Sequence, residues 1–113
     1  EKKFIFISFP GSSDVIGDII YEGDYICQTD YYKELTILKN LLRNEKVIFL
    51  DIFDQVKAAT KKWIQTEDYT YFTWFKMDPH YSVTGNKIIA NIVLDYTNNN
   101  VKPSQKYLKK CIN

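Results

Sequence analysis

The residues best suited to chemistry lie in one segment of the chain, from Asp78 to Asn86. It contains the only histidine, His80, which follows Asp78 with the rigid Pro79 between them. In a serine hydrolase a carboxylate fixes the tautomer of an imidazole, and the imidazole takes the proton of the nucleophilic serine. The segment therefore offers the acid–base pair of such a site. The sequence shows no obvious candidate for the nucleophile.

Three serines lie near the predicted site or near a strand end, and each has a simpler explanation than nucleophilic attack. Ser82 is close to His80, but it is better placed to cap the helix that follows, with Thr84 competing for that position. Ser12 and Ser13 follow the first predicted strand, where open α/β sheets place their binding groups. A Pro-Gly-Ser-Ser turn accounts for both without a ligand.

Aromatic and acidic residues supply the other candidate positions. The aromatic side chains between positions 69 and 81 are dense enough for a sugar or acyl pocket, although such density is more often core. Trp74 and Tyr81, the two nearest to His80, are the predicted substrate-binding residues. Asp51 and Asp54 follow the second predicted strand, and could do acid–base work or hold a cation. A helix cap at Asp54 explains one of them more simply.

Composition narrows the possible functions. The chain has 113 residues, enough for one domain, and a net charge of +1 from interspersed charges, which gives no reason to expect nucleic acid. No apolar run approaches the ~20 residues of a membrane span. One histidine and two isolated cysteines predict no metal site, and the absence of a glycine-rich phosphate loop predicts no nucleotide cofactor.

Two further properties stay open at the level of sequence. Cys27 and Cys111 are as compatible with a disulfide as with two free thiols. The chain starts at Glu1 and enters a strand almost at once, so we expect that it does not begin at the natural start of the gene. An upstream leader is compatible with this, and an extracytoplasmic location stays open.

The elements that must position these residues follow from hydrophobic patterning. The apolar run Phe4–Phe9 predicts a strand covered on both faces, and 47–50 predicts a second. Helices are predicted over 30–43 with Asp30 as cap, from Asp54 onward, and over 84–96. Residues 14–28 are predicted as a long loop with one helical turn at most, and 66–77 as irregular. The tail after Pro103 shows helical spacing.

This order predicts an α/β domain with a parallel strand pair and a right-handed crossover. Two strands are too few for a sheet covered on both faces, and a strand as apolar as Phe4–Phe9 makes a poor exposed edge. We therefore expect residues 1–113 to form a single, partial domain. Its missing neighbour is either an absent N-terminal half or another chain.

The same residues resemble a known family. A strand ending before Pro10, a helix over 31–43, a strand at 47–50 and the motif Asp78-x-His80-x-Ser82-x-x-Gly85-Asn86 before an isoleucine-rich helix resemble the C-terminal half of SGNH/GDSL-type hydrolases. The alginate-type polysaccharide O-acetyltransferases are also similar, because they often show Asp-x-His-aromatic-Ser-x-x-Gly. The single residue between acid and histidine favours that branch.

The resemblance implies a flavodoxin-like three-layer sandwich around a parallel sheet, of which this chain holds about two strands and their flanking helices. It also implies that Asp78 orients His80 and that His80 is the general base. The family's Gly-Asp-Ser turn and its oxyanion residues are absent from these 113 residues, so the serine is expected outside the chain. The implied function is ester hydrolysis or O-acyl transfer, with carbohydrate acetyl esters as the expected substrate class. The alternative is a non-catalytic interaction module built on the same scaffold.

Overall fold

The computed structural model of the protein describes residues 4–21, 25–42, 47–68, 71, 73, 74, 80–99 and 111. Over these residues the chain forms a mixed α/β fold, as predicted. Its elements are β1 (Phe4–Ser8), α1 (Ser12–Ile20), the 3₁₀ helix η1 (Ile26–Gln28), α2 (Asp30–Leu41), β2 (Val47–Asp51), α3 (Phe53–Thr66) and α4 (Val83–Asn99).

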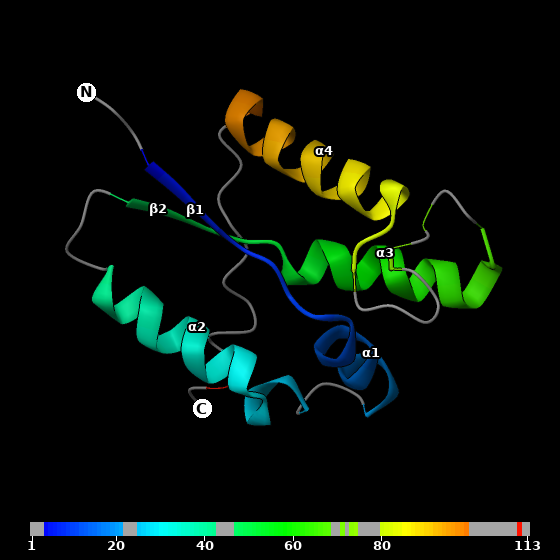
Figure 1. The fold of residues 1–113 in the computed structure, drawn as a ribbon, viewed down its shortest axis with the longest axis horizontal. Helices are drawn as coiled ribbons and strands as arrows, with labels where there is room; N and C mark the ends of the chain where they lie inside the picture. The colour runs from blue at the N-terminus through cyan, green and yellow to red at the C-terminus, as the bar shows by residue number, and fades with distance from the viewer. Residues whose placement is uncertain are drawn as a thin grey trace.

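The two strands pair in parallel, which confirms the predicted strand pair. Their register runs from Phe4 opposite Val47 to Ser8 opposite Asp51. In Figure 1, α2 and α4 lie on opposite sides of the strand pair, while α1 and α3 begin beyond the carboxyl ends of the strands. This arrangement puts one helix on each side of the strand pair but leaves the first residues of β1 exposed, and the carboxyl ends of the strands face the loops that carry polar residues.

β1 exposes much of its apolar surface. Within the described part of the chain it pairs with β2 alone, and Phe4 and Phe9, at its start and just past its end, are 66% and 53% exposed. Phe6 stacks on Phe49 of β2 but remains about a third exposed. A strand rich in aromatic residues with an open edge is a surface that natural proteins usually cover.

Helix α1 corrects the prediction of a long loop over residues 14–28. The carbonyl of Gly11 accepts a hydrogen bond from Val15 N–H, and Asp14 Oδ2 accepts one from Gly11 N–H at 3.2 Å. Gly17, which gave the segment its loop-like composition, is buried because the ring of Tyr25 packs directly against its Cα. Glycine is there for close packing rather than to break the helix.

The helix caps also differ from those predicted. The hydroxyl of Thr29, not Asp30, caps α2 by accepting a hydrogen bond from Tyr32 N–H at 3.3 Å. At the start of α3 the carboxylate of Asp51 accepts the N–H of Phe53 at 3.0 Å, and Asp54 lies in the first turn. In both cases a residue earlier in the chain than the predicted cap, by one position for Thr29 and by three for Asp51, supplies an oxygen to an N–H of the first turn.

The core of the described part of the chain lies mainly among the helices beyond the carboxyl ends of the strands, and Leu50 is its one strand residue. The leucines of α2 are only partly buried, since Leu35 is buried and Leu41 is exposed. On α4 the buried apolar residue is Ile89, and that helix extends three residues past the predicted end at Tyr96. The buried apolar cluster consists of Val15, Ile26, Tyr32, Leu50, Ile52, Phe53, Val56, Trp74 and Ile89.

Two long-range links fasten the α1–η1 region. Asp18, fully buried in α1, forms an ion pair with Lys57 of α3 at 2.6 Å and accepts the N–H of Ile26 at 3.2 Å. Cys27 of η1 is joined to Cys111 by a disulfide, which resolves the open question of the two thiols. The rest of the predicted helical tail lies outside the described residues. No helix in the described part of the chain is long and apolar enough to cross a membrane.

Candidate functional site

The segment that carries His80 is closed by a short antiparallel contact. Trp74 and Tyr81 form an isolated β-bridge, and Ser82 N–H donates to the carbonyl of Thr73 at 2.9 Å. His80 comes immediately before this bridge and is exposed. The predicted acid, Asp78, lies outside the described residues.

Tyr81 links this segment to the sheet. Its hydroxyl donates a hydrogen bond to the carbonyl of Pro10, and its ring meets that of Phe9 edge-on with centroids 6.4 Å apart. Burial raises the pKa of the Tyr81 hydroxyl, and the nearby charge of Asp14 raises it further. The phenol is therefore a neutral donor at physiological pH. Through it, the residue next to His80 is held at the carboxyl end of β1.

Trp74 and Tyr81, predicted to bind substrate, lie against each other with ring centroids 5.2 Å apart. Trp74 is only 5% exposed, and its indole N–H finds no hydrogen-bond partner among the described residues. Tyr81 is partly buried between Trp74 and Phe9. The structure thus brings both predicted residues together beside His80, as a packed aromatic pair.

The three serines of the region lie at the starts of helices. Ser82 is 2% exposed and its hydroxyl accepts the N–H of Gly85 at 2.9 Å, which confirms that it, and not Thr84, caps α4. Ser12 and Ser13 form the first turn of α1 instead of the predicted turn. They lie just after the carboxyl end of β1, at the same end of the sheet as Tyr81.

Asp51 and Asp54 lie close enough to interact, and the carboxylate of Asp51 accepts the N–H of Phe53. Burial raises the pKa of Asp51, and the hydrogen bond from Phe53 N–H opposes that rise. The Asp54 charge raises the pKa of Asp51 further. In the described part of the chain, no three His, Cys, Asp or Glu side chains gather as a metal site would require. Asp51 is the last residue of β2, and its hydrogen bond from Phe53 N–H gives its buried carboxylate a partner without any ligand.

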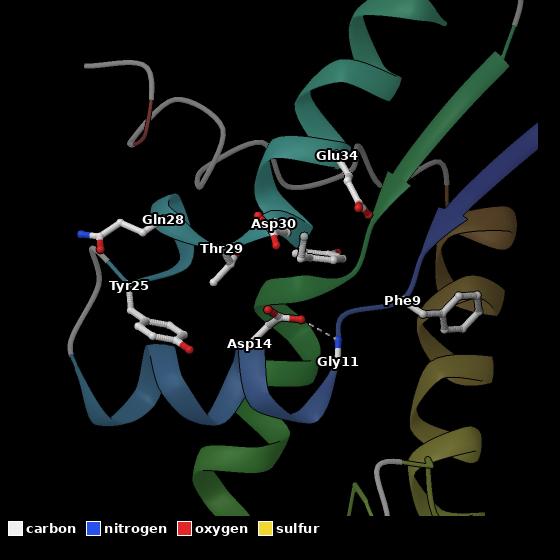
Figure 2. Close-up of a pocket in the computed structure, with 9 residues that line it drawn as sticks. Phe9, Gly11, Asp14, Tyr25, Gln28, Thr29, Asp30 and Glu34 are labelled. Carbon is white, nitrogen blue, oxygen red and sulfur yellow. Dashed lines mark hydrogen bonds between the residues drawn. The ribbon is translucent and has the colours of Figure 1, made fainter.

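A pocket of about 640 Å³ opens at the same end of the sheet. Figure 2 shows it between the N-terminal turn of α1 and the first turns of α2, with Phe9 on the side of β1. Its volume falls in the range of small-molecule sites. The residues that line it are Phe9, Gly11, Asp14, Tyr25, Gln28, Thr29, Asp30, Tyr31 and Glu34.

The lining of this pocket is acidic and aromatic. Three carboxylates face it, from Asp14, Asp30 and Glu34, and none of its nine lining residues is Lys, Arg or His. Burial raises the pKa of Asp14, and the charges of Asp30 and Glu34 raise it further against the opposing hydrogen bond from Gly11 N–H. Such a lining disfavours anionic ligands.

Sequence reasoning missed this pocket because α1 and η1 were predicted as a loop. The signal that could have located it is the N-terminal pattern of Gly11 and Asp14, three residues apart directly after a strand. The chain was compared with protein families, curated proteins and solved structures, and none of them matches it.

Proposed function

We propose that this chain is the C-terminal segment of a serine ester hydrolase or O-acyltransferase of the SGNH type, with a flavodoxin-like sheet completed by strands outside the chain. The observation that carries the proposal is the hydrogen bond from Tyr81 to Pro10. It places the neighbour of His80 at the carboxyl end of a parallel strand, which is where open α/β sheets bind their ligands.

In the proposed reaction, a serine from outside the chain attacks an acyl carbonyl. His80 takes the serine proton and later returns it to the leaving alcohol, while Asp78 stabilises the imidazolium that forms between these steps. Backbone N–H groups outside the chain hold the oxyanion. The acyl group then passes to water in a hydrolase or to a second alcohol in a transferase. Neither route calls for a metal or an organic cofactor.

The open edge of β1 supports the part of the proposal that concerns missing strands. A parallel sheet covered on both faces buries the side chains of its central strands, yet Phe4 and Ile5 point to opposite faces and both are exposed. A further strand with its own helices would cover both. The proposal places the serine on the polypeptide that supplies this strand.

The substrate class follows from the pocket beside the site. Its carboxylates disfavour anionic acyl esters, and its aromatic and hydrogen-bonding groups suit an uncharged, hydroxyl-rich alcohol. Carbohydrate acetyl esters meet both conditions. The proposed substrate is therefore an acetyl ester of an uncharged carbohydrate.

The test is hydrolysis of p-nitrophenyl acetate by the purified protein together with any chain that co-purifies. His80→Ala should lower kcat/KM by about 10³-fold or more, because the general base is lost. Lys87→Ala, an exposed change in the same stretch of chain, is the matched control and should leave kcat/KM unchanged. Equal rates for His80→Ala and the unmodified protein would refute the proposal.

The exposed apolar surface of β1 favours one alternative, a non-catalytic interaction module that binds a partner by strand addition. In that case His80→Ala leaves partner binding intact, whereas a charged substitution at the centre of β1, Phe6→Lys, abolishes it. Co-sedimentation of the purified chain with its partner distinguishes the two functions.

A further inference from the structure

We propose that Tyr81 is a positioning residue for His80, in that its hydroxyl, bonded to Pro10, holds the histidine at the carboxyl end of β1. This inference rests on the proposed function for its catalytic consequence. The structural part of the inference is that the Tyr81 hydroxyl sets the position of the His80 imidazole. This part can be tested even if the protein shows no esterase activity.

The contacts of Tyr81 divide into two groups. Its ring packs between Trp74 and Phe9, and its backbone joins Trp74 in the β-bridge. The contacts with Trp74 fix Tyr81 within its own segment, whereas the edge-on contact with Phe9 already reaches the end of β1. The hydroxyl adds a directed link, because it donates to the carbonyl of Pro10, 71 positions earlier and two residues past β1. This hydrogen bond ties the segment before α4 to the end of β1.

The need for such a link follows from the exposure of His80. Packing covers little of an exposed side chain, so the anchoring of the adjoining backbone contributes to where the imidazole lies. On its C-terminal side the anchors are Tyr81 and Ser82, and Ser82 is bonded to Thr73 and Gly85. Those partners belong to the same segment and to α4. The bond of Tyr81 reaches further, to the strand end where the proposed reaction takes place.

A general base must stay within about 3 Å of the proton that it removes. A displacement of about 1 Å costs on the order of 10²-fold in rate. Loss of the Tyr81 hydroxyl should therefore lower kcat more than it raises KM, because Tyr81 sets the position of the base rather than binding the ester.

The experiment uses the fact that His80 is the only histidine, so its imidazole gives a single set of signals in a two-dimensional nitrogen–proton spectrum. Tyr81→Phe keeps the ring and removes the hydroxyl. We expect the imidazole signals to shift and broaden in this variant, and kcat for p-nitrophenyl acetate to fall about 10- to 100-fold with KM nearly unchanged. Tyr71→Phe, which removes a hydroxyl bonded to Lys62, is the control and should change neither.

Replacement of Tyr81 by 4-aminophenylalanine restores a donor to Pro10 and should return the imidazole signals to their original positions. It also serves if Tyr81→Phe does not fold. Unchanged His80 signals in a folded Tyr81→Phe variant would overturn the positioning role. Absence of esterase activity in the unmodified protein would instead refute the proposed function, and the spectra would still decide the role of Tyr81.

Discussion

Gly85, in the first turn of α4, lies directly against the carbonyl of Thr73. A Cβ built at Gly85 would overlap the oxygen and carbon of that carbonyl, which also accepts the N–H of Ser82. Thr73 is held from its other side by Thr60 of α3, whose hydroxyl lies 3.0 Å from its own. This close approach sets where α4 begins and therefore where the preceding His80 can lie.

The first prediction concerns this contact. In an open helix position Gly85→Ala would stabilise the protein by up to about 1 kcal/mol, because alanine is the better helix former. Here the added methyl group meets backbone rather than a mobile side chain, so we expect destabilisation of about 1–3 kcal/mol. Urea denaturation measures the change. Gly17→Ala is the comparison, because its added methyl group meets the ring of Tyr25 instead of backbone. A stabilised Gly85→Ala variant would contradict the described packing.

Reduction of the disulfide should weaken the fold. The Cys27–Cys111 bond closes a loop between positions 84 apart, and a bond of this kind typically contributes about 2–4 kcal/mol by restricting the unfolded chain. Denaturation with and without a reductant gives the difference. The double variant Cys27→Ser with Cys111→Ser should show no effect of reductant. A thiol titration of the native protein that finds two free thiols would show that the bond is not formed.

The buried ion pair gives a third prediction. Lys57→Met leaves the carboxylate of Asp18 buried without its cation, which should cost about 3–5 kcal/mol. Lys33 makes an exposed pair with Asp30 at 3.5 Å, so Lys33→Met should change stability by less than about 1 kcal/mol. Equal effects of the two substitutions would show that Asp18 is not buried as described.

Asp51 makes stability depend on pH. Burial raises its pKa in the folded protein above the ordinary value of 3.8, so folding favours the protonated acid. Its contribution is therefore favourable below 3.8 and is lost as the pH rises through the folded pKa. Asp51→Asn retains an oxygen for Phe53 N–H and should remove this decline. Unfolding measured from acid to neutral pH tests it, and an unchanged pH dependence would contradict it.

The elements with local sequence patterns could be predicted from the sequence alone. Continuous apolar runs located β1 and β2, and the spacing of Ile89 with its neighbours located α4. Ser82 was correctly assigned as a cap because a hydroxyl before an amphipathic helix has few other uses. Helix α1 was missed because the role of Gly17 depends on Tyr25, a tertiary contact that no local pattern reports.

The site could be predicted only in part for the same reason. Residue types identified His80 and its aromatic neighbours, but the bond from Tyr81 to Pro10 joins segments 71 positions apart. The acidic pocket likewise depends on α1 and α2 meeting at the end of β1, since Asp14 and Glu34 are not close in sequence. Contacts of this kind follow from the packing of elements and not from the pattern of any one of them.

The most direct test of the central claim is labelling with a serine-directed fluorophosphonate, followed by intact mass measurement of every polypeptide in the purified sample. The account predicts one adduct, on a polypeptide or segment outside these 113 residues, and loss of that adduct when His80 is replaced by alanine. Absence of an adduct on any species, or an adduct that persists in His80→Ala, would contradict the claim that His80 activates a serine.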